Sequence, residues 1–264
     1  MDVTRLCQCV AVNQIRESIR RVVSRPVQYI VRLARDAGEI RAAQTLRFQV
    51  FNLELNEGLA QSYATGRDED PFDAVCDHLL VEHLPSQQIV GTYRLQTGAN
   101  AAKNLGYYSA QEFEFDVFEP LRSEIVELGR ACVHRQHRNV IVLGLLWRGI
   151  ADYATGHGAR YLLGCSSITS QDAAVGASAY TELCRKKHVV EIAWQTRPRP
   201  EFDCPLDRLA EEPVCLPKLL RAYLSIGAKI CGPPALDCGF QTIDFLTLVD
   251  LRQMAAPARA RFLS

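Results

Sequence analysis

The stretch ELGRACVHRQHRN, residues 127–139, carries more ionisable side chains than a buried strand can hold. Glu127 and Arg130 lie in a strand-like run, and the basic turn after them leads into an apolar segment. A carboxylate can take up a proton during a reaction, and a guanidinium can bind an anion. These residues therefore suggest a site for acid–base chemistry. The alternative is an ion pair or solvent-facing charges on an edge strand.

The positions of the two charged side chains limit how they can share a site. Side chains alternate between the faces of a strand, so Glu127 and Arg130 should point to opposite faces. They can meet at one site only if the strand is bulged or splayed. Gly129 lies between them, and we expect the bulge there because glycine tolerates it.

The turn HRQHRN, residues 134–139, directly precedes a predicted helix. The first turn of a helix has unpaired backbone N–H groups and a partial positive charge, so it binds phosphate readily. Arg135 and Arg138 add cations beside it. We therefore expect a phosphate-binding turn, with a solvated loop as the alternative.

The flanking sequence predicts alternating strands and helices that would position these groups. Strands are predicted at 28–34, 77–84, 87–98, 124–133 and 159–168, and helices at 37–55 and 139–158. Residues 64–73 contain Gly, Pro and acidic residues and predict a surface loop. Residues 171–222 read as a helical or irregular insertion, and strands at 228–237 and 243–251 follow it.

Composition excludes several classes of protein. The 264 residues have a formal net charge of zero, which argues against binding nucleic acid through a global field. Ten cysteines occur without a C-x-x-C pair or a secretory apolar segment, which predicts reduced thiols in the cytoplasm and no metal site. No apolar run is long enough to span a membrane. Residues 10–23 predict an amphipathic helix with Arg16, Arg20 and Arg21, which either packs on the domain or contacts anionic lipid or an acidic partner.

Several short motifs, read together, resemble a known superfamily. They are LRFQVF (46–51), DEDPFD (68–73), DHLLV (77–81), VGTYRL (90–95) and ELGR (127–130). This order resembles the GNAT acyltransferases, in the branch that contains acyl-homoserine-lactone synthases and N-acyl amino acid synthases. The glycine-rich signature of coenzyme A-dependent members is absent, and RQHRNV stands in its place. The resemblance therefore implies acyl carrier protein as the donor.

Within that branch the chain most resembles the L-ornithine N-alpha-acyltransferases of ornithine-lipid biosynthesis, a family often called hemolysin-like. The shared motifs also include LLWRGIADY (145–153), YLLGCSSI (161–168), YLSIGAKICGPPALD (223–237) and DFLTLVDL (244–251). The resemblance implies an α/β (α+β) GNAT fold with a central, mostly antiparallel, splayed sheet flanked by helices. It implies a basic arm at 1–27, an acyltransferase domain at 28–252 with an insertion at 171–222, and a tail at 253–264.

The implied reaction moves a long-chain acyl group, with or without a 3-hydroxyl, from acyl carrier protein to the α-amino group of L-ornithine, giving lyso-ornithine lipid. A thioester is already activated, so we expect neither a cofactor nor a cysteine nucleophile. The residues carried over by the resemblance fall into three groups. The catalytic residues are Glu127, the expected base acting directly or through water, with Arg130 and Arg94. The acceptor-binding residues are Arg47, Phe51, Asp70 and Asp73, and those that bind the phosphopantetheine donor are His134, Arg135, Arg138 and Asn139.

In this scheme Arg94 or Arg130 binds the acceptor carboxylate, and Asp70 or Asp73 binds its distal ammonium. The shared motifs leave other products open: another N-acyl amino acid, a glycine lipid or an acyl-homoserine lactone. A protein of a different class, which binds acyl carrier protein or lipid without catalysis, is the second alternative. We expect a cytoplasmic location, with peripheral contact at the inner face of the membrane through the basic arm as an open alternative.

Overall fold

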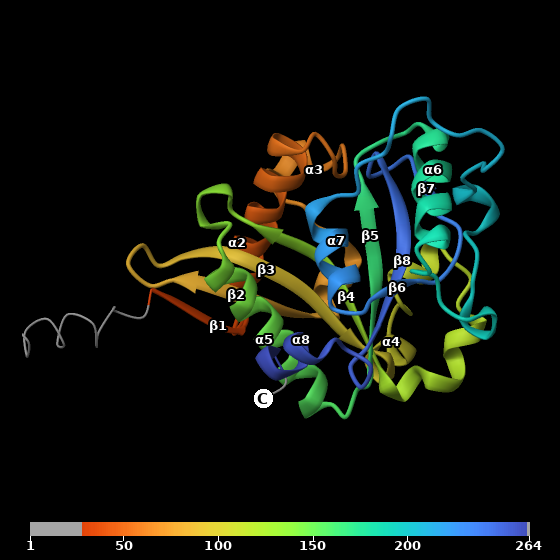
Figure 1. The fold of residues 1–264 in the computed structure, drawn as a ribbon. Coiled ribbons are helices and arrows are strands. Elements are labelled where there is room, and N and C mark those ends of the chain that lie inside the picture. The colour runs from red at the N-terminus through yellow and green to blue at the C-terminus, as the bar shows by residue number, and fades with distance from the viewer. Residues whose placement is uncertain (1–27, 263–264) are drawn as a thin grey trace, which may run out of the picture.

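The computed structural model describes residues 28–262, and one mixed sheet dominates this part of the chain (Figure 1). Eight strands within it form the order β1-β2-β3-β4-β5-β8-β6, with β7 also paired to β8. Their bounds are β1 Tyr29–Leu33, β2 Asp77–His83, β3 Gln88–Thr97, β4 Ile125–Val133, β5 Tyr161–Ile168, β6 Lys229–Ile230, β7 Ala235–Asp237 and β8 Thr242–Asp250. All neighbours pair antiparallel except β4 and β5, which run parallel. The GNAT fold class is therefore confirmed.

Helices cover both faces of this sheet. The α-helices are α2 Ala37–Phe48, α3 Ser62–Thr65, α4 Gly98–Lys103, α5 Val140–Gly156, α6 Ala173–Arg185, α7 Lys218–Ser225 and α8 Ala256–Phe262. A π-helical segment, Gln49–Glu54, extends α2. Short 3₁₀ helices occupy Pro71–Ala74, Ser109–Gln111, Asp116–Glu124, Arg135–His137, Ile192–Trp194 and Pro200–Phe202. None of the described helices is long and apolar enough to span a membrane.

Helices α5 and α2 pack on opposite faces of the sheet. Val133 of β4 belongs to the apolar cluster formed with α5, whereas its neighbour Cys132 belongs to the cluster formed with α2. Successive side chains of a strand point to opposite faces, so α5 and α2 enclose β4 between them. The Asp36 side chain caps α2 and the Asn139 side chain caps α5, each accepting hydrogen bonds from two backbone N–H groups.

The sheet splits between its two parallel strands. β4 and β5 pair only over Ile125–Glu127 and Tyr161–Leu163. Beyond these residues β4 continues along β3, and β5 continues along β8. The strands part immediately after a very close contact, because a Cβ atom placed on Gly164 would lie 2.1 Å from the Leu128 carbonyl oxygen. The splay implied by the resemblance is therefore present, and Gly164 marks where it begins.

The predicted bulge in β4 is also present, but it is centred one residue later. Arg94 faces Gly129 and Thr92 faces Cys132, so β4 contributes one more residue than β3 between these pairs. Arg130 has a φ of 50°, in the left-handed region that non-glycine residues rarely adopt. The bulge changes which face the next side chains reach. Glu127 and Arg130 consequently line the same cavity.

Replacing Gly164 with Ala is expected to destabilise the protein by about 1–3 kcal/mol, because the new methyl group would overlap a backbone carbonyl and force the strands apart. For a domain of this size that corresponds to a fall in Tm of roughly 2–10 °C, measured by differential scanning fluorimetry. Gly156→Ala is the matched control, since a Cβ atom there would have no neighbour within 4 Å. An unchanged Tm in Gly164→Ala would contradict the close approach.

Candidate active site

The candidate site is a cavity of about 340 Å³ at the split between β4 and β5. Its walls come from β3, β4, β5, α7 and the segment 237–249 that includes β8. Four of the predicted site residues line it: Phe51, Arg94, Glu127 and Arg130. The split provides the space, and the bulge in β4 directs charged side chains into it. The fold thus brings together residues that the chain separates by up to 79 positions.

Three buried arginines and three aspartates form a charge-balanced network behind one wall of the cavity. Its members are Arg47, Arg94, Arg130, Asp68, Asp70 and Asp73. Asp68 is fully buried and Asp73 is 5% exposed. The prediction of a surface loop at 64–73 is therefore correct only in part: Ala64, Thr65 and Pro71 are exposed, whereas Asp68, Phe72 and Asp73 are buried. The loop folds inward because the buried guanidinium groups require counter-ions.

Arg47 is the best-satisfied cation of this network. Its Nε donates to Asp68 Oδ2 at 2.7 Å, and its Nη1 and Nη2 donate to the two oxygens of Asp73 at 2.9 and 2.7 Å. Burial alone would raise the pKa of Asp73, but the hydrogen bonds and charge of Arg47, with the charge of Arg94, hold that pKa well below its usual range. Arg47 is not among the residues that line the cavity. This geometry does not support a direct role for Arg47 in binding the acceptor.

Asp70 and Asp73 likewise form ion pairs with arginines and lie outside the cavity wall. Arg94 Nη1 donates to Asp70 at 2.6 Å and to Asp73 at 3.0 Å, and Arg130 Nη2 donates to Asp70 at 3.0 Å. Both aspartates border a separate depression beside α2 instead. Their geometry does not support the prediction that they select the distal ammonium of the acceptor.

Arg94 retains binding capacity toward the cavity. The Arg94 side chain is only 3% exposed. Its Nη2 is buried and has no hydrogen-bond partner among residues 28–262. The rings of Phe72 and Tyr108 lie 5.6 and 5.1 Å from its guanidinium carbon and hold it in place. A buried donor without a partner is costly, and an anionic ligand would satisfy it.

Glu127 points into the same cavity and is 5% exposed. Its two carboxylate oxygens accept hydrogen bonds from the backbone N–H groups of Tyr108 and Ser109, each at 2.8 Å. Burial raises its pKa above the usual value despite these hydrogen bonds. The Ser109 side chain is a third hydrogen-bond partner, so about one of the roughly four acceptor sites of the carboxylate remains for a substrate or a water molecule. Glu127 can therefore anchor the 107–109 segment and still take up a proton.

The predicted donor turn lies outside the cavity wall. The Arg138 guanidinium pairs with Glu54 at 2.5 and 2.8 Å and also donates to the Val133 carbonyl. The Asn139 side chain accepts hydrogen bonds from the N–H groups of Ile141 and Val142, so the helix start is partly capped by the chain itself. His134 is half-buried and Arg135 is exposed. A phosphate at this turn would find Arg135 and the remaining N–H groups of the first helical turn.

Cys132 does not take part in the site. It packs in an apolar cluster with α2, and burial raises its pKa to about 12. A thiol with this pKa carries almost no thiolate near neutral pH. The described cysteines are all free, and none forms a disulfide.

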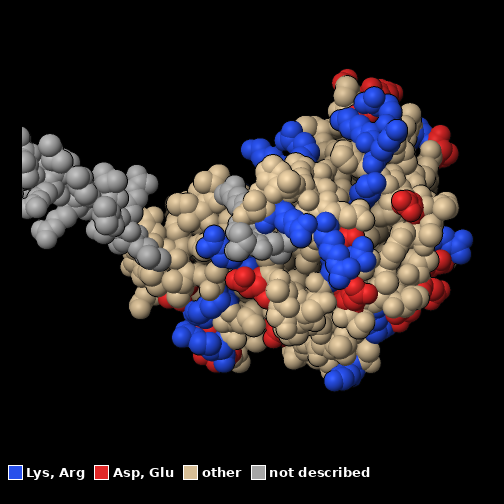
Figure 2. All heavy atoms as spheres, turned by 60° about the horizontal axis from the view of Figure 1, so that its bottom comes forward, with Lys and Arg blue, Asp and Glu red and all other residues tan. Residues whose placement is uncertain are grey.

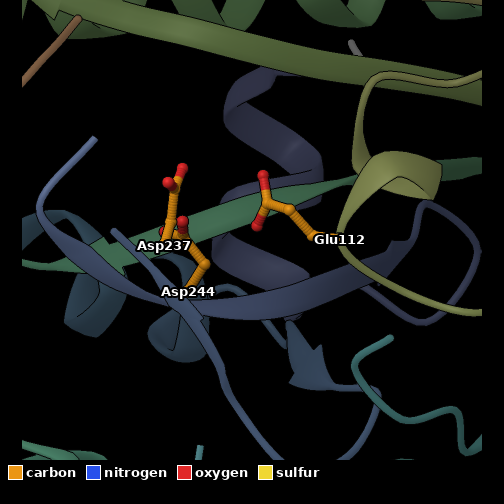
Figure 3. A group of neighbouring side chains, drawn as sticks. All are labelled: Glu112, Asp237 and Asp244. Atoms are coloured by element: carbon orange, nitrogen blue, oxygen red, sulfur yellow. The ribbon is translucent and has the colours of Figure 1, made fainter. Parts of the chain in front are cut away.

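Sequence reasoning missed a second group of charges on the opposite wall of the cavity. Glu112, Asp237 and Asp244 each offer an oxygen, and these atoms all lie within 4.8 Å of one another. Figure 3 shows the three side chains converging on a common space. Burial raises the pKa of Asp244 to about 6 and that of Glu112 well above its usual value. The one local signal was Asp244 itself, an acid inside the apolar strand β8.

The comparisons with known proteins identify the family. Residues 46–148 match the model of the acetyltransferase (GNAT) domain. The chain is 34% identical to an L-ornithine N(alpha)-acyltransferase of Brucella abortus, over 86% of this chain and 85% of the relative. A protein of that name from Rhizobium meliloti is 33% identical over 90% of this chain and 88% of its own length, and one from Rhodobacter capsulatus is 31% identical over 89% and 94%.

Solved structures agree on the fold. The N-acyl amino acid synthase FeeM from uncultured soil microbes superposes with a TM-score of 0.53 at 11% identity, covering 89% of this chain and 95% of that one. The coenzyme A-dependent acyl-homoserine lactone synthase BjaI superposes with a TM-score of 0.50 at 14% identity, covering 88% and 86%. Taken with the relatives above, the chain belongs to the L-ornithine N(alpha)-acyltransferase family of the GNAT superfamily.

Proposed function

We propose that this protein transfers a long-chain 3-hydroxyacyl group from acyl carrier protein to the α-amino group of L-ornithine. The observation that carries the proposal is the cavity at the split of β4 and β5, which Glu127 and Arg94 both line, in a chain of this family. The products are lyso-ornithine lipid and the free thiol of the carrier protein.

The reaction requires a neutral amine, because an ammonium has no lone pair. Glu127, directly or through one water, takes a proton from the α-amino group of the acceptor. The amine nitrogen then attacks the thioester carbon, a C–N bond forms, and the C–S bond breaks. The sulfur leaves as thiolate and takes up a proton, so one proton is released overall for each ammonium consumed.

Two further features support the proposal. Beyond Glu127 the edge of β4 that faces β5 has no strand partner, so its backbone N–H groups are available to stabilise the oxyanion of the tetrahedral intermediate. Arg94 Nη2 is available for the acceptor carboxylate. Arg130 is held by Asp68 and Asp70, and through Asp70, which also pairs with Arg94, it positions the Arg94 guanidinium.

The docking surface for the donor is proposed at the start of α5. Val140, Ile141 and Leu143 are apolar residues that are 70%, 54% and 43% exposed there, next to the exposed Arg135. Figure 2, which turns the lower side of Figure 1 forward, shows Lys and Arg on that face in separate patches with acidic residues beside them. Docking of an acidic carrier protein would therefore depend on local contacts and not on one broad basic face. The basic arm at 1–27 lies outside the described residues.

Expression in a bacterial host that makes no aminolipids tests the function. We expect the lipid extract to contain lyso-ornithine lipid by mass spectrometry, and the empty vector is the control. The purified protein should form the same product from acyl carrier protein donor, and more slowly from the corresponding coenzyme A thioester. Accumulation of another acylated amine in place of lyso-ornithine lipid would reassign the acceptor, and no acylated product in either assay would refute the activity.

A further inference from the structure

We propose that Glu112, Asp237 and Asp244 form the pocket that binds the side-chain ammonium of the acceptor, while Arg94 binds its carboxylate. This inference rests on the proposed function, because it assigns the acceptor to the cavity at the split sheet. It names the residues that would distinguish an amino acid with a second, distal ammonium from one with an apolar side chain.

The geometry of the three carboxylates fits an ammonium ion. They come from different elements: Glu112 follows the 3₁₀ helix Ser109–Gln111, Asp237 ends β7, and Asp244 lies on β8. One oxygen from each lies within 4.8 Å of the other two (Figure 3). An alkylammonium carries three N–H donors, one for each carboxylate.

The described part of the chain supplies no ion-pair partner to this cluster. Glu112 and Asp244 are 3% exposed and Asp237 is 8% exposed, yet no Lys or Arg among residues 28–262 forms an ion pair with any of the three. Arg130 is the cation whose charge reaches Glu112, but its hydrogen bonds go to Asp70 and the Tyr108 hydroxyl. Like charges this close cannot all ionise, so without a cation the Glu112 carboxyl keeps a proton and hydrogen-bonds to Asp244. An ammonium would replace that proton as the counter-charge of the cluster.

One oxygen of the cluster is left without a partner. The Thr242 hydroxyl donates to Asp244 Oδ2 at 3.1 Å, and the Ser167 and Glu112 side chains also interact with the Asp244 carboxyl. Asp244 Oδ1 is buried, and no donor of the described structure meets it in hydrogen-bond geometry. Asp237 Oδ1 is occupied by the N–H groups of Gly239 and Phe240 at 2.7 and 2.9 Å. A buried acceptor without a donor is costly, and a ligand N–H would satisfy it.

An ammonium suits this cluster better than a divalent metal ion. The partners described above leave about one oxygen of each aspartate for a ligand, and Glu112 adds its own. Calcium takes six to eight oxygen ligands and magnesium takes six in a strict octahedron. Three acceptor oxygens that converge on one side of a cavity match the three N–H donors of an ammonium, and the cavity leads from there to Arg94 and Glu127.

The two ends of the cavity therefore match the two ends of the acceptor. Arg94 pairs with Gly129 on one branch of the split sheet, and Asp244 pairs with Ser167 on the other branch. Glu127 lies where the branches separate, at the last residue that pairs β4 with β5. An acceptor that spans the branches would present its α-amino group to Glu127.

The test compares ornithine with norleucine, which replaces the side-chain ammonium with a methyl group of similar size. In Asp244→Asn we expect kcat/KM for ornithine to fall about 10- to 100-fold, mainly through KM, because a charge-assisted hydrogen bond is lost. Turnover of norleucine should stay within about threefold of wild type or rise. Asp152→Asn removes an exposed carboxylate on α5 and should change neither acceptor.

Ligand-induced stabilisation gives a readout that does not need turnover. Saturating ornithine should raise the Tm of the wild type and should raise that of Asp244→Asn much less. If ornithine is not acylated but still stabilises only the wild type, the proposed reaction is wrong and the ammonium pocket stands. If ornithine is acylated and Asp244→Asn keeps the wild-type ratio of ornithine to norleucine, the pocket assignment is wrong and the reaction stands.

A second variant and a metal-binding measurement provide further tests of the assignment. Glu112→Gln serves as the second variant, with the same expected loss of selectivity, should Asp244→Asn fail to fold. Magnesium, calcium and manganese are each tested alone on chelator-treated protein. A Tm increase with one of these metals but not with ornithine, lost in the variant, would overturn the ammonium assignment in favour of a metal site.

Discussion

Glu127→Gln is expected to lower kcat/KM for ornithine by about 10²- to 10⁴-fold, the usual contribution of a general base. Glutamine cannot take up the proton that the α-amino group must lose. Its amide can also accept a hydrogen bond at only one of its two ends, so one of the N–H groups of Tyr108 and Ser109 loses its partner. Steady-state kinetics with the carrier-protein donor measure the effect.

The dependence on pH separates proton transfer from anchoring of the 107–109 segment. Burial raises the pKa of Glu127, and only the ionised form can act as base. In the wild type, kcat/KM should therefore fall as the pH drops through a value above the usual range of a glutamate. In Glu127→Gln the inflection that belongs to Glu127 should be absent, and the residual activity should follow only the neutral fraction of the free α-amine, which falls steadily as the pH drops.

Binding supplies the control for this variant. If Glu127 is the base, ornithine should still raise the Tm of Glu127→Gln while kcat collapses. If Glu127 only anchors the backbone, stabilisation by ornithine and turnover should be lost together, and the acid limb of the pH profile should remain. Near-normal turnover in Glu127→Gln would exclude Glu127 as the base.

Local patterns in the sequence located most of the elements, whereas the fold class was implied by the family resemblance. The alternating residues of β4 and the apolar run of α5 predicted both elements within about two residues of their observed bounds. These signals depend on neighbours in the chain, which is why they can be read without a structure. The bulge was predicted one residue early, because Gly129 tolerates it sterically whereas the ladder with β3 places it at Arg130.

The electrostatics of the site depend on contacts between distant segments and could not be read in this way. The acidic loop at 68–73 has the composition of a surface turn, and only the arginines of α2, β3 and β4 explain its burial. The acidic cluster combines Glu112 with Asp237 and Asp244, more than 120 residues further along the chain. Loop composition predicts exposure, but a buried counter-charge overrides it.

Arg47 is the position where this network predicts the largest loss of stability. Arg47→Met keeps an unbranched apolar side chain but leaves Asp68 and Asp73 buried without their main cation. Breaking a buried ion pair by removing one partner typically costs 3–5 kcal/mol, so we expect the free energy of unfolding to fall by about that amount. For a domain of this size the Tm should fall by roughly 6–20 °C.

Arg35→Met is the matched control, because Arg35 also makes a two-pronged contact with a carboxylate, Glu39, but is 70% exposed. Exposed ion pairs contribute about 0–1 kcal/mol, so its Tm should change little. Equal losses in the two variants would contradict a special role for the buried network.

The pH dependence of stability gives a second test of the electrostatic role of Arg47, and the direction of the expected change can be stated. In the wild type the pKa of Asp73 is lowered, so its contribution is present above the unfolded-state pKa and is lost as the pH falls below it. In Arg47→Met the guanidinium no longer offsets the effect of burial on the Asp73 carboxylate, so the pKa of Asp73 should rise instead. The difference in unfolding free energy between the two proteins should therefore shrink on acidification from neutral pH, because the variant can protonate its unpaired carboxylates. A difference in unfolding free energy that stays constant with pH would mean that Arg47 contributes packing only. A separate measurement, a higher KM for ornithine in folded Arg47→Met, would restore a role for Arg47 in binding the acceptor.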